Sequence, residues 1–110
     1  MQRPDHLGLG DIREAIGAIE RFLTGVDLYR FLESEIIRHA VLLNLIVIGE
    51  AATSLSDAFK GHNSHISWRE PIRLRNRLVH GYFAVDWEMV WDTATRDVPA
   101  LARDLASVSS

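Results

Sequence analysis

The sequence contains no cysteine, which excludes disulfide bonds and metal sites that depend on thiolate ligands. Nothing in the composition requires an oxidising compartment, and we expect a cytoplasmic protein. Residues 1–16 hold acids and glycines where a secretory signal needs a basic start and an apolar run, so no export signal is expected.

Long apolar runs are also missing. The most apolar stretch, residues 36–48, is interrupted by Arg38, His39 and Asn44, and it is shorter than the ~20 residues that cross a bilayer. We predict a buried helix there and no membrane partner. The apolar belt of this helix fits either the core of one chain or the seam between two copies.

Positive charge is scarce overall, with 12 Lys and Arg against 15 Asp and Glu and a formal net charge of −3. A protein that coats nucleic acid through bulk charge needs a broad excess of basic residues, so any nucleic-acid site here must be local. Lys60 is the only lysine. The other basic side chains are arginines, whose planar guanidinium group suits bidentate contacts with phosphate.

Signatures of metal and nucleotide-phosphate sites are lacking as well. No glycine-rich phosphate loop occurs, and the acidic residues are not spaced to gather carboxylates around magnesium. His62 and His65 share one segment without a third nitrogen or a nearby acid, which is too few ligands for zinc. We therefore predict no metal and no cofactor, and we exclude kinases and P-loop enzymes.

Helix breakers are few, with 7 Gly and 3 Pro in 110 residues, and no repeat or linker divides the chain. Residues 1–110 are therefore predicted to form one domain, large enough to fold on a single core. Apolar residues at helical spacing predict an all-α bundle of four to five helices. The predicted helices cover residues 5–24, 27–34, 34–59, 67–80 and 86–108, with a loop at 60–66.

Local signals set the predicted helix ends in the first half of the chain. Gly25 ends the first helix, and Asp27 and Ser34 are the N-caps of the second and third. The third helix is apolar almost all round, so we expect it to be central and buried on nearly all sides. Gly49 within it predicts close packing against another helix.

The second half carries its own capping signals. Ser67 and Glu70 have the spacing of a capping box, which predicts the start of the fourth helix. Gly81 is expected to end that helix as a left-handed cap. Asp86 is predicted to cap the fifth helix, and Pro99 to kink it.

Polar residues crowd the fourth predicted helix more than packing requires. At about 100° per residue, Arg73, Asn76 and His80 form one polar stripe, and Arg77 flanks it. Arg75 lies ~140° from His80 around an ideal helix and cannot meet the imidazole by sharing a face. Either the helix unwinds near His80, or the two side chains meet across a symmetric interface between two copies.

This set of side chains suits the chemistry of a phosphodiester, although an Arg- and His-rich helix face is more often solvated surface. An imidazole can take a proton from an attacking hydroxyl, and a guanidinium can stabilise the added negative charge on the phosphate. RNA supplies its own nucleophile in the 2′-hydroxyl, so histidine and arginine suffice without a metal, and DNA would be inert.

The segment RNRLVHGY, residues 75–82, contains Arg, four residues, His, one residue and Tyr. It is flanked by NLIVIGEAA at 44–52, Trp68, FAVDWEMVW at 83–91 and DVPAL at 97–101. In this motif and this order of segments, nearly the whole chain resembles the HepT-like branch of the HEPN superfamily. The resemblance implies a HEPN helical bundle that forms a homodimer, with both motifs along a shared cleft, where Arg75 and His80 can meet.

The resemblance also implies a metal-independent endoribonuclease toxin that cleaves RNA. Arg75 and His80 are then the catalytic residues, with Asn76 in support, and Tyr82 completes the motif. Arg73 and Arg77 are assigned a supporting role beside them. Asn76 could instead bond a neighbouring helix, and Tyr82 could be a core ring with its hydroxyl at the surface.

By the same resemblance, the partner is a small nucleotidyltransferase antitoxin of the MntA type that transfers AMP to the motif tyrosine, here Tyr82. The added phosphate and bulk beside His80 would fill the cleft and compete for the arginines. An alternative of a different class is a non-catalytic HEPN binding module that docks a nucleotidyltransferase and nucleotide. A third reading is a purely structural helical dimer.

Overall fold

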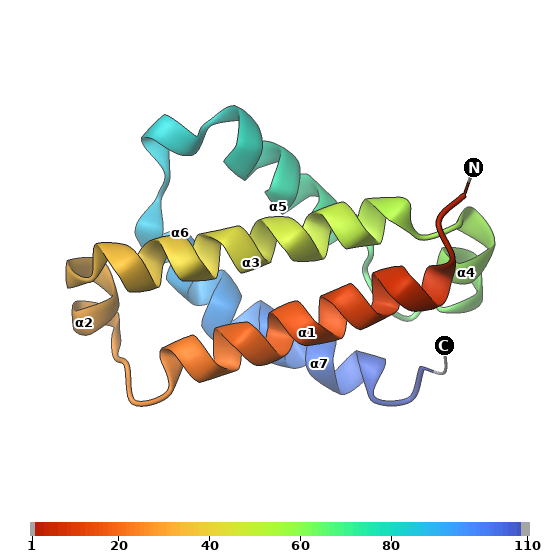
Figure 1. The fold of residues 1–110 in the computed structure, drawn as a ribbon, viewed down its shortest axis with the longest axis horizontal. Coiled ribbons are helices and arrows are strands. Elements are labelled where there is room, and N and C mark those ends of the chain that lie inside the picture. Colours follow the sequence, from red (N-terminus) through yellow and green to blue (C-terminus); the bar gives the residue numbers. More distant parts are fainter. Residues whose placement is uncertain (1, 109–110) are drawn as a thin grey trace.

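A computed structural model describes residues 2–108, and every regular element in this range is helical (Figure 1). The long helices are α1 (Asp5–Leu23), α3 (Glu35–Ser54) and α5 (Arg69–His80). Three adjoining segments form one further continuous helix, which we call the last rod. They are α6 (Trp87–Asp92), the π-helical segment η2 (Thr93–Asp97) and α7 (Val98–Leu105). The connections hold the short elements α2 (Leu28–Glu33), α4 (Asp57–His62) and the 3-10 turn η1 (Tyr82–Ala84). The predicted all-α bundle is confirmed.

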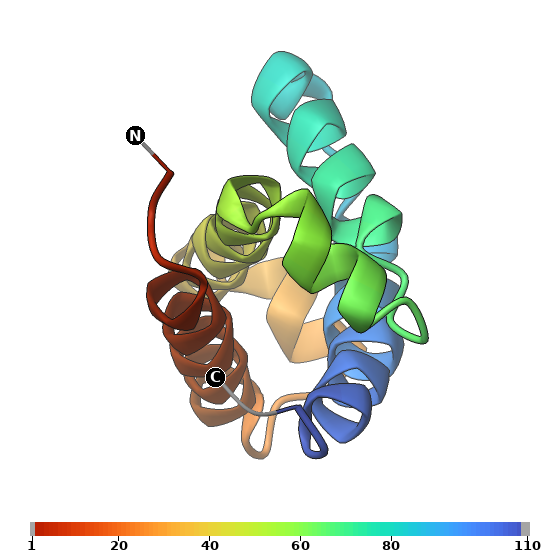
Figure 2. The same ribbon diagram turned by 90° about the vertical axis from the view of Figure 1, so that its right-hand side faces the viewer.

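The hydrophobic core lies between α1, α3 and the last rod, which surround it in Figure 2. α1 contributes one apolar face, because its core residues recur every three or four positions. Gly8 brings α1 close to α3, since a Cβ built there would lie 3.4 Å from the Ala51 carbonyl oxygen. The most deeply buried large side chains are Leu9, Ile12, Ile19, Phe31, Val41, Val90 and Leu105.

Only part of α3 is buried, which corrects the prediction of burial on nearly all sides. Val41, Leu45 and Ile48 face the core, whereas Ile36 is 83% exposed and Leu43 is 61% exposed. Ile36 and Leu43 are two turns apart and therefore share one helix face. By length and composition α3 is apolar enough to cross a membrane, but the core helices of soluble proteins pass the same test. In this structure α3 packs against α1 and α5.

The end of α3 differs from the predicted one. α3 stops at Ser54, and residues 57–62, predicted as helix end and loop, form α4 instead. Ser56 causes the break, because its hydroxyl oxygen accepts the Phe59 amide at 3.1 Å and so caps a new helix. The Ser56 amide and hydroxyl in turn donate to Asp5 at 2.8 and 2.7 Å, and these two bonds lower the pKa of the Asp5 carboxyl.

The predicted capping box at Ser67 does not form. The N-cap of α5 is Trp68, without a side-chain cap bond, and Ser67 is exposed. Trp68 is 7% exposed, and its indole nitrogen donates to the Asn63 carbonyl at 3.1 Å. α5 therefore begins next to a buried ring, one residue later than the capping box predicts. The predicted caps Asp27, Ser34 and Asp86 are confirmed, each accepting a backbone amide three residues ahead.

Backbone geometry corrects the prediction for Gly81 and shows how the helix around Pro99 is built. Gly25 adopts the left-handed conformation, with φ of 71°, but Gly81 has φ of −133° and is not a left-handed cap. Pro99 does not interrupt its helix. The helix widens to π geometry just before it, where the Val98 amide donates to the Thr93 carbonyl five residues back.

α5 is attached to the bundle differently from the other long helices. It packs mainly on α3, and Leu78 is its only fully buried residue. Figure 1 shows α5 leaving α3 at a wide angle, with the cyan turn after it farthest from α1. The chain returns from this turn to the last rod, so residues 80–85 form an arch.

Candidate functional site

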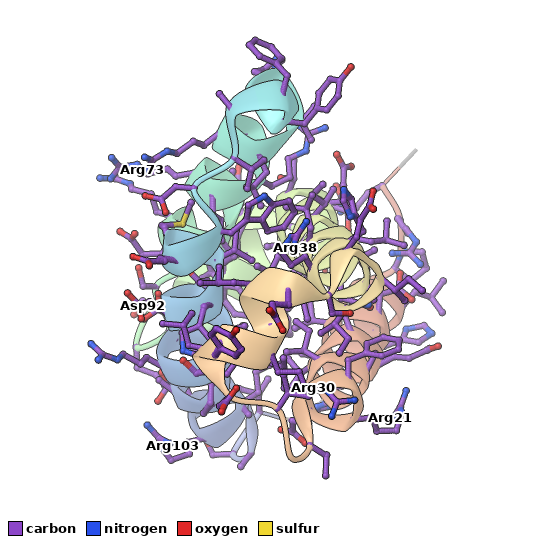
Figure 3. The ribbon with its side chains drawn as sticks, turned by 90° about the vertical axis from the view of Figure 1, so that its left-hand side faces the viewer. Arg21, Arg30, Arg38, Arg73, Asp92 and Arg103 are labelled. Carbon is purple, nitrogen blue, oxygen red and sulfur yellow. The ribbon has the colours of Figure 1, made fainter. Side chains whose placement is uncertain are left out.

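The polar residues of the fourth predicted helix lie on α5, which carries four arginines against one glutamate. Not every arginine of the chain is available for a ligand. Arg38, labelled in Figure 3, is half-buried, and its guanidinium group sits 5.2 Å from the centre of the Trp87 ring. Arg73 points outward from α5 in the same view. Arg69, Arg73 and Arg77 of α5 are exposed, so this helix presents a local excess of positive charge while the chain as a whole is acidic.

Arg75 occupies the side of α5 that faces α3. Its guanidinium group forms an ion pair with Glu50, and its Nη1 atom donates to the Asn76 side-chain oxygen at 2.8 Å. The Arg75 side chain is 28% exposed. Two partners from two helices thus fix a guanidinium group that solvent still reaches, and Asn76 bonds Arg75 rather than a neighbouring helix.

Gly49 makes this arrangement possible. A Cβ built at Gly49 would lie 2.6 Å from the Pro71 carbonyl oxygen and would overlap the Arg75 Cβ atom. Neither atom can rotate away, because one is backbone and the other is attached directly to it. The prediction of close helix packing at Gly49 is confirmed, and the contact places Glu50 beside Arg75.

Arg73, Asn76 and Arg77 line a groove between α5 and the last rod, with a volume of about 730 Å³. Leu45 and Ile48 of α3 are among its apolar lining residues, and acidic residues line it from α5 and the last rod. Three members of the predicted polar cluster therefore share one side of α5. The acidic residues of this groove are Glu70, Asp97 and Asp104.

His80 is exposed and is the last residue of α5, so it does not line the groove. Helical geometry continues through His80, with the Gly81 amide donating to the Arg77 carbonyl at 3.1 Å. Unwinding near His80 is therefore ruled out as a way to bring Arg75 and His80 together within one chain. Tyr82 follows on the arch and is 71% exposed, so it is not a core ring.

Comparison with known protein families shows to which family the chain belongs. The model of a family described as "Ribonuclease HepT-like" matches residues 12–108. This chain belongs to the ribonuclease HepT-like family. A protein of Thermococcus cleftensis named "Probable ribonuclease HepT" is 39% identical over 101 residues, which is 92% of each chain. A Methanocaldococcus jannaschii protein named "Putative RNase MJ1380" is 32% identical over 100 residues, 91% of this chain and 92% of its own. No solved structure matches this chain.

Sequence reasoning did not assign a role to one residue of this candidate site. Glu50 lies in the segment GEAA that supported the resemblance, but its pairing with Arg75 joins positions 25 residues apart on different helices. Two signals were available, an acid next to the packing glycine and an excess of arginines on the facing helix.

In residues 2–108, no three His, Asp or Glu side chains gather as a metal site.

Proposed function

We propose that this HepT-like chain is a metal-independent endoribonuclease toxin, with Arg75 and His80 as its catalytic residues. Relatives named as ribonucleases support the RNA substrate. The observation that carries the proposal is the exposed imidazole of His80 at the end of the arginine-rich α5, on the same helix as an Arg75 that Glu50 and Asn76 hold in place. These are an acid–base group and a fixed positive charge, as phosphate chemistry needs.

The proposed reaction uses the nucleophile of the RNA itself. The 2′-oxygen attacks the adjacent phosphorus while His80 accepts its proton, and the bond from phosphorus to the 5′-oxygen breaks as that oxygen takes up a proton from water. The products are a 2′,3′-cyclic phosphate and a 5′-hydroxyl end. Arg75 binds the non-bridging oxygens, where charge increases in the transition state, and Arg73, Arg77 and Asn76 support binding of the strand.

The active unit is proposed to be a homodimer. Arg75 and His80 lie on different sides of α5, and the helix does not unwind between them. A composite site with Arg75 from one copy and His80 from the other resolves this separation. The exposed apolar side chains of Ile36 and Leu43, on one face of α3, are available to such an association.

Neutralisation is proposed to occur at Tyr82 by a minimal nucleotidyltransferase antitoxin of the MntA type. The Tyr82 hydroxyl oxygen would attack the α-phosphorus of ATP, release pyrophosphate and carry AMP. Its 71% exposure supports access by an enzyme. The added phosphate, two residues from His80, would compete for the arginines that bind RNA.

The test is cleavage of RNA in EDTA by the wild-type chain and by Arg75→Ala and His80→Ala. We expect each variant to lose activity by about 100-fold or more while remaining folded. Arg103→Ala, an exposed arginine on α7, is the matched control and should cleave normally. A 2′-deoxy residue at the cut site should block cleavage, and cleavage that needs a divalent metal would contradict the proposal.

Mixing the two inactive variants tests the composite site. A heterodimer of Arg75→Ala and His80→Ala keeps one intact pair, so random exchange should restore roughly a quarter of wild-type activity. Failure of complementation with demonstrated heterodimers would refute a site shared between copies.

One alternative function is favoured by a specific observation. Arg75 is already neutralised by Glu50 within the chain, as expected of a structural ion pair in a non-catalytic module that docks a nucleotidyltransferase and nucleotide. This alternative expects no RNA cleavage at any concentration. It also expects a complex with the nucleotidyltransferase that survives Arg75→Ala and His80→Ala.

A further inference from the structure

The arch carries two exposed aromatic rings next to His80. Phe83 is 81% exposed and Tyr82 is 71% exposed, although this chain buries Phe31 completely in its core. Their ring centres are 5.9 Å apart, and the ring planes meet at 81°. The two rings therefore form a right-angled corner that is open to solvent.

The arch holds this corner in place rather than leaving it loose. The Ala84 amide donates to the Gly81 carbonyl at 2.9 Å and closes the 3-10 turn. On one side Leu78 is buried, and on the other Val85 packs against the core before Asp86 caps α6. The exposure of Phe83 is thus built into an anchored turn.

The position of Phe83 is suited to a nucleic-acid strand held at His80. Three residues of chain span at most about 11 Å, which corresponds to about three stacked nucleotides at 3.4 Å each. The helix that leads to the arch concentrates four arginines in an otherwise acidic chain, which matches the charge of a phosphate backbone. Single-stranded RNA is commonly held by exposed aromatic rings against which its unpaired bases stack.

We infer that Phe83 is a base-stacking residue, which holds an unpaired RNA base within a few nucleotides of the scissile phosphate. The inference rests on the proposed ribonuclease function and adds to it the preference for a single-stranded target. Stacking needs only the ring face, so Phe83 contributes affinity for any base and little choice among the four.

The test measures kcat/KM for cleavage of a single-stranded RNA by wild type, Phe83→Ala, Phe83→Trp and Phe83→Leu. Loss of one stacked base corresponds to about a 5- to 150-fold decrease, seen mainly in KM. We expect this decrease in Phe83→Ala and Phe83→Leu and near-normal cleavage by Phe83→Trp. Tyr29→Ala is the matched control, because Tyr29 on α2 is exposed to the same extent as Tyr82 and should not matter.

Abasic substrates locate the contact. The substrates are a series of RNAs, each lacking one base at a different position. We expect one of them to be cleaved poorly by wild type and equally poorly by Phe83→Ala, because removing the base and removing the ring abolish the same contact. Equal cleavage by wild type and Phe83→Ala would overturn the inference while leaving the ribonuclease proposal intact. The inference would also be overturned if the decrease in kcat/KM caused by Phe83→Ala were the same on every abasic RNA, or if a changed oligomeric state explained that decrease.

A second measurement separates this inference from the proposed function. If wild type cleaves no RNA, binding of a 2′-O-methyl oligonucleotide that contains 2-aminopurine still reports stacking as quenched fluorescence. Quenching that is lost in Phe83→Ala and kept in Phe83→Trp would support the stacking role without cleavage. Equal quenching by all three proteins would refute it.

Discussion

Gly49→Ala should destabilise the protein, although alanine is the better helix former. A Cβ at this position would lie 2.6 Å from the Pro71 carbonyl oxygen and overlap the Arg75 Cβ atom, so α5 must move away from α3. Overpacking of this kind costs about 1–3 kcal/mol. The gain in helix propensity offsets about 1 kcal/mol of this cost, which leaves a net loss of up to about 2 kcal/mol.

The matched control is Gly10→Ala, the same chemical change within α1. A Cβ at Gly10 has no atom within 4 Å, so only the propensity gain of about 1 kcal/mol applies and the protein should become more stable. The difference between the two variants isolates the contact between α3 and α5 from the effect of adding a methyl group to a helix.

Urea unfolding followed by circular dichroism measures both changes. RNA cleavage, assayed where both proteins are folded, should fall in Gly49→Ala and not in Gly10→Ala, because only the first displaces Arg75 from Glu50. A Gly49→Ala protein as stable as Gly10→Ala would refute the reasoning from the close approach. Normal stability with normal cleavage would refute the link between this contact and the site.

Two further predictions concern Glu50 and Asp5. Glu50→Gln keeps the size of the side chain and removes the ion pair with Arg75, so kcat/KM for RNA should fall about 10- to 100-fold through misplacement of the guanidinium group. The free energy of unfolding should change by less than about 1 kcal/mol, since Glu50 is 53% exposed; unchanged kcat/KM would contradict a positioning role. The lowered pKa of Asp5 stabilises the folded state above the unfolded pKa of about 3.9, and this contribution is lost as pH falls through the folded value. The difference in unfolding free energy between wild type and Asp5→Asn should therefore be constant above about pH 5 and shrink below pH 4, and a difference that is flat across this range would contradict the role of the Ser56 bonds.

Helix type and most helix starts could be predicted from the sequence, because their causes are local. Asp27, Ser34 and Asp86 each bond an amide three residues ahead, a distance the chain sequence itself specifies. The errors have more than one origin. The break at Ser56 is a local cap that the prediction missed, whereas Ser67 had a capping pattern that is not used and the buried Trp68 stands at the start of α5 instead.

The candidate site was predictable in composition and not in arrangement. Periodicity placed Arg73 and Asn76 on one side of the helix and Arg75 on another, and the groove lining agrees. The partner Glu50 and the exposure of Phe83 depend on how α5 crosses α3. The two helices approach most closely at Gly49. A glycine in the sequence indicates that another helix packs closely there, but it does not indicate which helix.

The attachment of α5 to the bundle mainly through α3 separates chemistry from folding in this molecule. The central core joins α1, α3 and the last rod, whereas α5 contributes one fully buried residue to it. Amide hydrogens of α5 can therefore exchange with solvent through local opening, without unfolding of the whole domain. Substitutions along the outer face of this helix can alter what the protein recognises while the rest of the bundle keeps its fold.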